Sequence, residues 1–534
     1  MQAGHSFRVT AAAVVLAVGT ATGVLHGEAA SNPAFAQDVG IPSEDIDRYV
    51  SDLMAEERIP GAAVVVVRRD RVEYVRGFGA ASLRNPSPVT SQTVFDLASC
   101  SKSFTALAVL MLYHRGLIDL DNPATEYLPD FRLADDDASS RITVRHLLNH
   151  TSGLPGRFAE PLAFHSGPDA MDKLVSCMDR ILLNQPAGTS FEYSDLNYAL
   201  LGAIVERVTG TAFEEYLQEN VLEPLGLEST TLYPEEAALM HRADGHQISF
   251  GQVVARNTPS YRSAAPAGWV MSSAGDMGRW LILHLNEGRL DGRQMVPAPL
   301  IELMHTAEVT FTQDGRKIGY GMGWFTGVSA DHQPMLWHGG DTANFASDMV
   351  LLPGLDLGVA VLVNSQNSSR VHDIAPGVVS LILGQPFELP AAPWLASWQA
   401  ADIMATGATA LSVILLLVLP AYAWRQWRSR KLQEGRHTPP GHTRTLRVWR
   451  QVLPLTPLAL LTATLAAATS VAWVLLGVNV FGTLTRFGAF APPGVWASGW
   501  LLFATISSWA LVLAARTVVS ARRTRTARRT GDKG

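Results

Sequence analysis

The chain contains 534 residues, of which 47% are hydrophobic and 17% are charged. That length exceeds what one hydrophobic core usually organises, so we expect a globular domain together with further segments. Of the 42 Lys/Arg and 48 Asp/Glu residues, 16 and two lie in residues 403–534, which leaves a net charge of about −20 on the first 402 residues. This acidic balance argues against nucleic-acid binding by that part. Two cysteines, Cys100 and Cys177, exclude a disulfide scaffold and a cysteine-based zinc cluster.

Residues 1–36 predict a signal peptide. Arg8 precedes an uncharged stretch over residues 9–25, and Ala34-Phe35-Ala36 fits the small-x-small pattern before a signal-peptidase cut. An uncleaved segment would instead act as an N-terminal anchor with the same orientation. Both alternatives predict that the following residues are exported.

Residues 37–385 predict an α+β domain. Residues 61–67 form a continuous Ala/Val run and are followed, after a polar turn, by residues 72–77, and residues 348–352 and 358–363 form a similar pair, so each pair predicts a β-hairpin. Helical patterns cover residues 101–116, 194–210 and 276–288. Strands at both ends with helices between them indicate a sheet assembled from N- and C-terminal segments.

The remaining residues predict a membrane region. Residues 386–402 read as a linker, and three uncharged stretches are long enough to cross a hydrocarbon core: residues 403–424, 453–476 and 496–515. The basic loop 425–452 and the basic tail 516–534 are expected to be cytoplasmic by the positive-inside rule. These features predict a multi-pass cell-membrane protein in contact with the lipid bilayer, with its catalytic domain outside and its C-terminus in the cytoplasm. The absence of charges within the three stretches argues against transport.

The motif Ser99-x-x-Lys102 begins a strongly apolar helical run. Residues i and i+3 share a helix face, so the Lys102 amine is expected beside the Ser99 hydroxyl. Serine is a poor nucleophile without an adjacent base, and a lysine desolvated by apolar neighbours can supply one. Alone, the motif is as compatible with an exposed helix start.

Two further segments carry chemistry. Tyr193 lies just before an apolar run, where its hydroxyl could complete a proton relay with Lys102, and His338-Gly339-Gly340 leads into the late hairpin, where glycines allow a backbone to approach a ligand. His146 and His150 have the i, i+4 spacing of zinc ligands but no glutamate between them, so a metal is not expected.

Together these motifs resemble the serine β-lactamase-related family, which includes class C β-lactamases, D-alanyl-D-alanine carboxypeptidases, D-aminopeptidases and esterases. The resemblance covers about residues 45–385, with Ser99-x-x-Lys102, Tyr193-Ser194-Asp195 and His338-Gly339-Gly340 in the family's order. Further similar stretches are residues 142–155, 266–268 and 319–324. No serine lies in Gly-x-Ser-x-Gly, which argues against an α/β-hydrolase.

The resemblance implies an antiparallel sheet flanked by helices plus a mostly helical lobe, with the site between them. Ser99 would attack a carbonyl, Lys102 and Tyr193 would share the general-base role, and the backbone N–H groups of Ser99 and Asp341 would bind the oxyanion. Substrate contacts are implied for Asp195, His338, Gly339, Gly340 and Asn344. No cofactor is implied, the partner is a small-molecule or peptide substrate, and the oligomeric state stays open.

Two departures bear on the substrate. Asp195 stands where the family has Asn, and His338 replaces the Lys of the Lys-Thr-Gly version, so the fixed positive charge that meets a substrate carboxylate is lost or becomes pH-dependent. We therefore expect a serine hydrolase acting through an acyl-enzyme on an ester, an amide or a D-amino-acid peptide, and efficient β-lactam hydrolysis is doubtful. The alternative is a sensor of penicillin or cell-wall peptide that is acylated at Ser99 without turnover.

Overall fold

The computed structural model describes residues 40–156, 164–249, 251–256, 258–313, 315–329, 332–366 and 369–387, and residues 403, 406, 407, 410, 424, 425, 428 and 429. The chain divides into two compact units, Met1–Gln247 with Val253–Ser397 and Ile248–Gln252 with Trp398–Gly534. The first unit contains the fold described below, except for residues 248–252.

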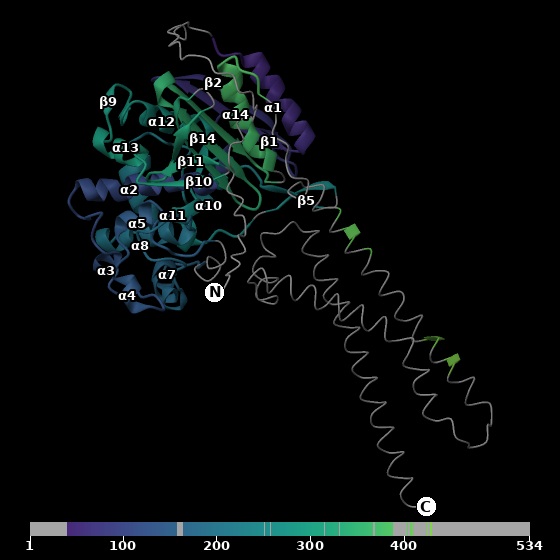
Figure 1. Ribbon diagram of the computed structural model, residues 1–534. Helices are drawn as coiled ribbons and strands as arrows, with labels where there is room; N and C mark the ends of the chain where they lie inside the picture. The colour runs from purple at the N-terminus through teal and green to yellow at the C-terminus, as the bar shows by residue number, and fades with distance from the viewer. Residues whose placement is uncertain are drawn as a thin grey trace, which may run out of the picture. The chain divides into compact units, whose positions relative to one another are not determined.

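A nine-stranded antiparallel sheet forms one layer of this unit (Figure 1). Its strand order is β10-β11-β12-β13-β14-β15-β1-β2-β3. The strands are β1 (Gly61–Arg68), β2 (Arg71–Ser82), β3 (Ser87–Pro88), β10 (Val309–Gln313), β11 (Arg316–Tyr320), β12 (Phe325–Val328), β13 (Pro334–Asp341), β14 (Ala346–Leu352) and β15 (Leu357–Val363). The N-terminal strand β1 pairs with the late strand β15, with Val64 opposite Val361. The expected hairpins and the joining of distant segments are confirmed.

The central strand β1 is buried on both faces, which explains its continuous Ala/Val run. Val64 and Val66 pack toward α1 (Ser43–Glu57) and α14 (Ile374–Ile382), whereas Val65 contributes to the core on the opposite face, with α12 (Ala274–Leu285). Full burial of each valine contributes about 1.5–3 kcal/mol to folding. Figure 1 shows α12 and α14 lying over the sheet.

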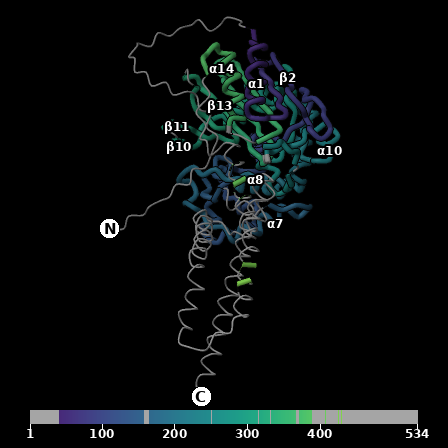
Figure 2. Tube along the Cα trace, turned by 90° about the vertical axis from the view of Figure 1, so that its right-hand side faces the viewer, coloured from purple at the N-terminus to yellow at the C-terminus, as the bar shows by residue number. Residues whose placement is uncertain are grey.

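The helical lobe is built around α2 (Ser101–His114) and α8 (Asp195–Thr209) (Figures 1 and 2). Phe104 of α2 stacks on Trp280 of α12, with ring centroids 3.8 Å apart, and so ties the lobe to the sheet layer. The other helices are α3 (Ala124–Tyr127), α4 (Asp136–Ser139), α5 (Val144–Leu148), α7 (Ala170–Cys177), α9 (Phe213–Leu217), α10 (Pro234–Leu239), α11 (Ala265–Gly268) and α13 (Ala298–His305).

Short elements complete the described structure. They are the strands β4 (Val94–Asp96), β5 (His246–Ser249), β6 (Gln252–Ala255), β7 (Met271–Ser273), β8 (Arg289–Leu290) and β9 (Arg293–Gln294). The short 3-10 helices are η1 (Ala98–Cys100), η2 (Met178–Arg180), η4 (Arg262–Ala264), η5 (Pro353–Leu355) and η6 (Ser369–Asp373), and η3 (Gln218–Leu222) is a short π-helix. The α+β part of the predicted fold is thereby confirmed.

The predicted fold class requires one correction, which concerns the three transmembrane helices. Across the described part of the chain, no helix combines the length and the apolar character needed to cross a membrane. The prediction rested on the number of consecutive apolar residues, and such a number alone does not establish that the stretch forms a helix across a membrane. Residues 453–476 and 496–515, the predicted signal peptide, and nearly all of residues 403–424 lie outside the described residues.

Candidate active site

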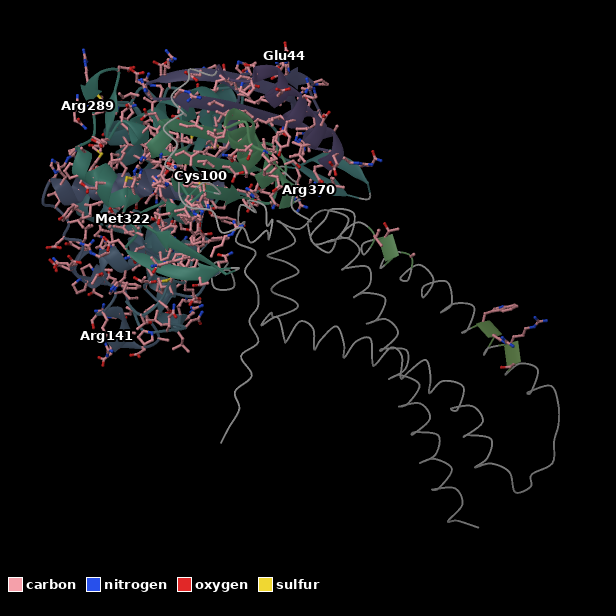
Figure 3. The ribbon with its side chains drawn as sticks, turned by 45° about the horizontal axis from the view of Figure 1, so that its top comes forward. Glu44, Cys100, Arg141, Arg289, Met322 and Arg370 are labelled. Atoms are coloured by element: carbon pink, nitrogen blue, oxygen red, sulfur yellow. The ribbon has the colours of Figure 1, made fainter. Side chains whose placement is uncertain are left out.

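Ser99 lies at the centre of the turn η1, directly before α2. The preceding residue, Ala98, has a φ of +47°, in the left-handed region that costs a non-glycine residue about 1–2 kcal/mol. The surrounding structure holds this turn, since the N–H of Leu97 donates to the C=O of Val270 (2.9 Å). The half-buried Ser99 is thereby presented at the helix start, and its neighbour Cys100 is labelled in Figure 3.

Lys102 lies beside Ser99, one helical turn further along, with its side chain fully buried. Its Nζ is 3.1 Å from the Ser99 Oγ, 2.5 Å from the Asp195 Oδ1 and 2.8 Å from the carbonyl oxygen of Ala267. Three oxygens match the three hydrogens of an ammonium group. Lys102 is therefore fixed by Asp195 and Ala267 within hydrogen-bonding distance of the Ser99 hydroxyl.

The Pro266-Ala267-Gly268 stretch forms α11 and supplies the carbonyl that holds Lys102. The hydroxyl of Thr105, on α2, donates to the carbonyl of Pro266 (2.7 Å) and fixes α11 against that helix. Gly202 of α8 allows the approach from the other side, because a Cβ there would lie 2.1 Å from the Pro266 ring. A backbone oxygen has no side-chain signature, so sequence reasoning missed this contact.

Tyr193 presents its ring to Lys102, whose Nζ is 4.8 Å from the ring centroid. The Tyr193 segment is held by His150, which is fully buried and lies 4.4 Å from Tyr193 between ring centroids. The His150 carbonyl accepts from the N–H of Glu192 (2.8 Å), and its Nδ1 accepts from the N–H of Ser194 (3.3 Å). Burial first, and then the charge of Lys102 and the nearby His338, hold the pKa of His150 well below its usual range.

His150 is therefore a neutral acceptor that fixes the tyrosine segment. Its neighbour His146 caps α5 instead: its Nδ1 accepts from the N–H of Thr143 (3.3 Å). Over the residues that the structure describes, no cluster of His, Cys, Asp and Glu forms a metal site. The sequence does not predict the positioning role of His150, because its partners Glu192 and Ser194 lie more than 40 residues further along the chain.

Gly340 of β13 brings that strand against the nucleophile. A Cβ at this position would lie 2.4 Å from the carbonyl oxygen of Leu97 and 2.9 Å from the backbone nitrogen of Ser99. Side chains essentially never approach backbone atoms so closely, so only glycine fits here. The close approach places the end of β13 beside the Ser99 N–H, where the oxyanion is expected.

His338 lies on the same face of β13 as Gly340 and is almost completely buried. Its Nδ1 is 2.7 Å from the Gly339 carbonyl oxygen, and its Nε2 is 3.3 Å from the Tyr320 hydroxyl. Burial, and then the charge of Lys102, lower the pKa of His338 to about 3. Its ring is therefore neutral throughout the physiological range and supplies no positive charge to a substrate.

Asp341 is the last residue of β13. The N–H of Thr342 donates to the Phe345 carbonyl (3.0 Å), and antiparallel pairs alternate, so the next pair, Asp341 with Ala346, directs its backbone groups away from β14. In the described register, β12 pairs with β13 only from Pro334 to Trp337. The role of the Asp341 N–H in binding the oxyanion stays a prediction.

The remaining predicted site residues divide into two groups. Asp195 begins α8 and belongs to the site through its ion pair with Lys102, and Gly339 lies beside His338 on β13. Asn344 contacts other segments of the chain instead. It is 1% exposed, and its amide donates to the Arg256 carbonyl (2.6 Å) and accepts from the Thr258 hydroxyl (3.1 Å). This placement gives Asn344 a structural contact in place of the expected substrate contact, a distinction that sequence position alone does not reveal.

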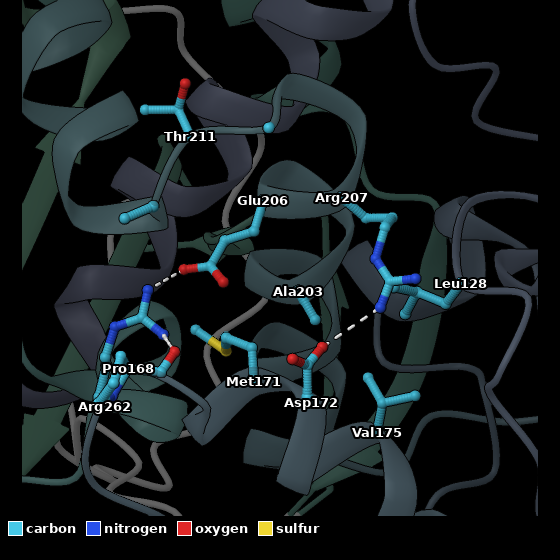
Figure 4. A pocket seen from close by; sticks show the side chains of 12 residues that line it. Leu128, Pro168, Met171, Asp172, Val175, Ala203, Glu206, Arg207, Thr211 and Arg262 are labelled. Atoms are coloured by element: carbon cyan, nitrogen blue, oxygen red, sulfur yellow. Dashed lines mark hydrogen bonds and ion pairs between the residues drawn. The ribbon is translucent and has the colours of Figure 1, made fainter.

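A cavity of about 340 Å³ lies apart from these residues, between α7, α8 and η4 (Figure 4). Ion pairs line it, Arg262 with Glu206 and Arg207 with Asp172. Since its arginines and carboxylates already neutralise one another, we assign it no role in the chemistry at Ser99.

Residues 46–382 match the protein family described as Beta-lactamase. The chain belongs to the β-lactamase family. Penicillin-binding protein 4 of Amycolatopsis lactamdurans is 32% identical over 325 residues, which cover 58% of this chain and 82% of that protein. Protein flp of Staphylococcus aureus (strain MW2) is 25% identical over 387 residues, 72% of this chain and 75% of that protein.

A solved structure supports the same fold. The octameric penicillin-binding protein homologue from Pyrococcus abyssi superposes with a TM-score of 0.57 at 26% identity, over 64% of this chain and 78% of that one. Membership of the β-lactamase family is consistent with serine hydrolase activity of the acyl-enzyme type. The roles of Ser99, Lys102 and Tyr193 stay predictions that the geometry makes specific.

Proposed function

We propose that this protein is a serine hydrolase that forms an acyl-enzyme at Ser99. The observation that carries the proposal is the 3.1 Å contact between the Lys102 amine and the Ser99 hydroxyl, inside a site closed by Ala267, Asp195 and Tyr193. Nucleophilic acyl transfer by serine requires a base beside the hydroxyl, and a positioned amine can act as that base.

In the proposed reaction the Ser99 Oγ attacks a carbonyl carbon, and its proton passes to the Lys102 and Tyr193 pair. The carbonyl oxygen becomes an oxyanion between the N–H groups of Ser99 and Asp341. Collapse of this intermediate breaks the bond to the leaving group, which takes up the proton and departs. Water then repeats the sequence on the ester of Ser99 and releases the acid.

We place neutral esters and amides, including D-amino-acid amides, ahead of β-lactams as substrates. His338 is neutral where a lysine would meet a substrate carboxylate, and the side chain of Asp195, which contacts Lys102, is 32% exposed. A partly exposed carboxylate in the site disfavours an anionic substrate. The second candidate function is acylation of Ser99 by penicillin, because two similar proteins are named as penicillin-binding proteins.

A matched set of variants tests the proposal. Wild-type protein is expected to hydrolyse p-nitrophenyl esters faster than nitrocefin or D-Ala-D-Ala peptides, and Ser99→Ala is expected to lose this activity. Ser103→Ala, which removes a buried hydroxyl of the same helix, serves as the control and should retain it. Labelling by a fluorescent penicillin without turnover of any substrate would favour the sensor alternative, and activity that survives Ser99→Ala would refute both.

We further propose an extracytoplasmic location, which rests on the N-terminal sequence pattern alone. Protease added to intact cells should then digest the domain. Digestion only after the cells are opened would contradict this location.

A further inference from the structure

His372 lies between two carboxylates beside the end of β13. It belongs to η6 and is 2% exposed. Its Nε2 is 2.8 Å from the Asp341 Oδ1, and its Nδ1 is 2.9 Å from both carboxylate oxygens of Asp348, on the neighbouring strand β14. A buried charge flanked in this way is expensive to create and is retained only where its partners satisfy it.

The cluster and the nucleophile lie on opposite faces of the same strand. Along β13, His338 and Gly340 face Ser99 and Lys102, so the intervening Gly339 and the terminal Asp341 face η6. A Cβ on Gly339 would indeed lie 3.1 Å from Asp348 and 3.6 Å from the His372 ring. The side chain of Asp341 is thus held on the face of β13 opposite Ser99, while its backbone N–H points away from β14.

The charges reinforce this arrangement. Burial alone would lower the pKa of His372, but Asp348 and Asp341 outweigh it and raise the pKa well above its usual range, so the imidazolium persists at neutral pH. Its two ring N–H groups then donate in opposite directions, which only a doubly protonated imidazole can do.

We propose that His372 is a positioning residue for acyl transfer, which fixes the oxyanion-binding N–H of Asp341 through a carboxylate–imidazolium–carboxylate clamp anchored on Asp348. The inference rests on the proposed function, since it concerns the same oxyanion. Asp341 pairs with Ala346 of β14, and its carboxylate accepts from the Gln366 amide (3.2 Å) as well as from His372, so these groups hold the end of β13. A misplacement of about 1 Å at such a group costs up to ~100-fold in rate.

The test is a double-mutant cycle on the full chain with His372→Gln, Asp341→Ala and the pair combined. The acylation rate constant and the substrate dissociation constant are measured separately by pre-steady-state kinetics with a p-nitrophenyl ester. Each single variant should lower the acylation rate by about 10- to 100-fold with little change in the dissociation constant. Because His372 acts through Asp341, the double variant should be no slower than Asp341→Ala.

His305→Gln is the control, since the imidazole of His305 is partly buried and contacts His284 (3.0 Å) in place of a carboxylate. It should acylate at the wild-type rate. A wild-type acylation rate constant in His372→Gln would overturn the inference. So would a double variant whose loss in rate equals the product of the two single losses. Either result would leave the proposed function standing. If His372→Gln does not fold, Asp341→Ala decides the question, and an unchanged acylation rate in that variant would overturn the inference. Absence of acylation in the wild type would instead refute the proposed function.

Discussion

The Lys102 Nζ lies 2.5 Å from the Asp195 Oδ1, at the position where the family has asparagine. The buried amine is therefore neutralised by a carboxylate while it also contacts the nucleophile. This contact holds the Lys102 amine beside the Ser99 hydroxyl, and its carboxylate places a negative charge in the site.

Asp195→Asn is expected to change the preference between neutral and anionic substrates. The asparagine keeps an oxygen acceptor for Lys102 but removes the carboxylate charge, so the repulsion of a substrate carboxylate falls. The kcat/KM for an ester that carries a carboxylate, divided by the kcat/KM for its neutral counterpart, should rise by about tenfold, because repulsion between two charges near a protein surface is on the order of 1 kcal/mol or more. Asp172→Asn, which breaks the exposed pair with Arg207, is the control. An unchanged ratio in Asp195→Asn would show that this carboxylate does not select against anionic substrates.

Gly340→Ala should abolish most activity. The added Cβ would lie 2.4 Å from the Leu97 carbonyl oxygen, so either β13 or the Ser99 turn has to shift. A displacement of this kind costs about 100-fold in kcat/KM. Gly354→Ala, where the nearest atom is the side-chain oxygen of Gln333 at 3.3 Å, should remain near wild type. Full activity in Gly340→Ala would mean that the strand does not approach the nucleophile as closely as described.

Ala98 offers a test of backbone strain. Ala98→Gly relieves a φ of +47° but increases the freedom of the unfolded chain, so the net gain in the free energy of unfolding should be about 0.5 kcal/mol. Ala98→Val places a β-branched residue in the same conformation and should lose about 2 kcal/mol. Urea denaturation measures both. Equal stability of the two variants would contradict the strained turn.

Acid should destabilise the fold through its buried neutral histidines. Burial lowers the pKa of His305 to about 4, below its usual 6.5, so between these values the unfolded state binds a proton that the folded state does not. Stability from this group is complete above pH 6.5 and falls as the pH drops toward 4, with a loss of about 2 kcal/mol at pH 5. In His305→Gln, the fall in unfolding free energy between pH 7.5 and pH 5 should be smaller by that amount. An identical fall in both proteins would contradict the lowered pKa.

The parts of the fold and site that are local in sequence were predictable. The i, i+3 spacing of Ser99 and Lys102 places them together because a helix begins there, and the Ala/Val run of β1 marks a strand buried on both faces. The meeting of this pair with Tyr193 and β13 followed from the family resemblance, since no periodicity relates segments so far apart.

The contacts that the sequence did not predict join segments far apart in the chain. The groups that make them belong to no recognisable sequence motif. His372 lies 31 residues beyond Asp341 and 24 beyond Asp348, in no recognisable pattern. The Ala267 carbonyl is a backbone atom, and Asn344 turned inward because its amide satisfies a neighbouring segment. Tertiary packing alone determines such contacts.

The central claim is that Ser99 is the residue acylated during turnover. Its most direct test is peptide mapping by mass spectrometry after reaction with a fluorophosphonate and, separately, with a slowly hydrolysed ester. We predict one adduct per chain, on the peptide that contains Ser99, formed much more slowly in Lys102→Ala. An adduct on any other residue, or none in a protein that turns over substrate, would contradict the account.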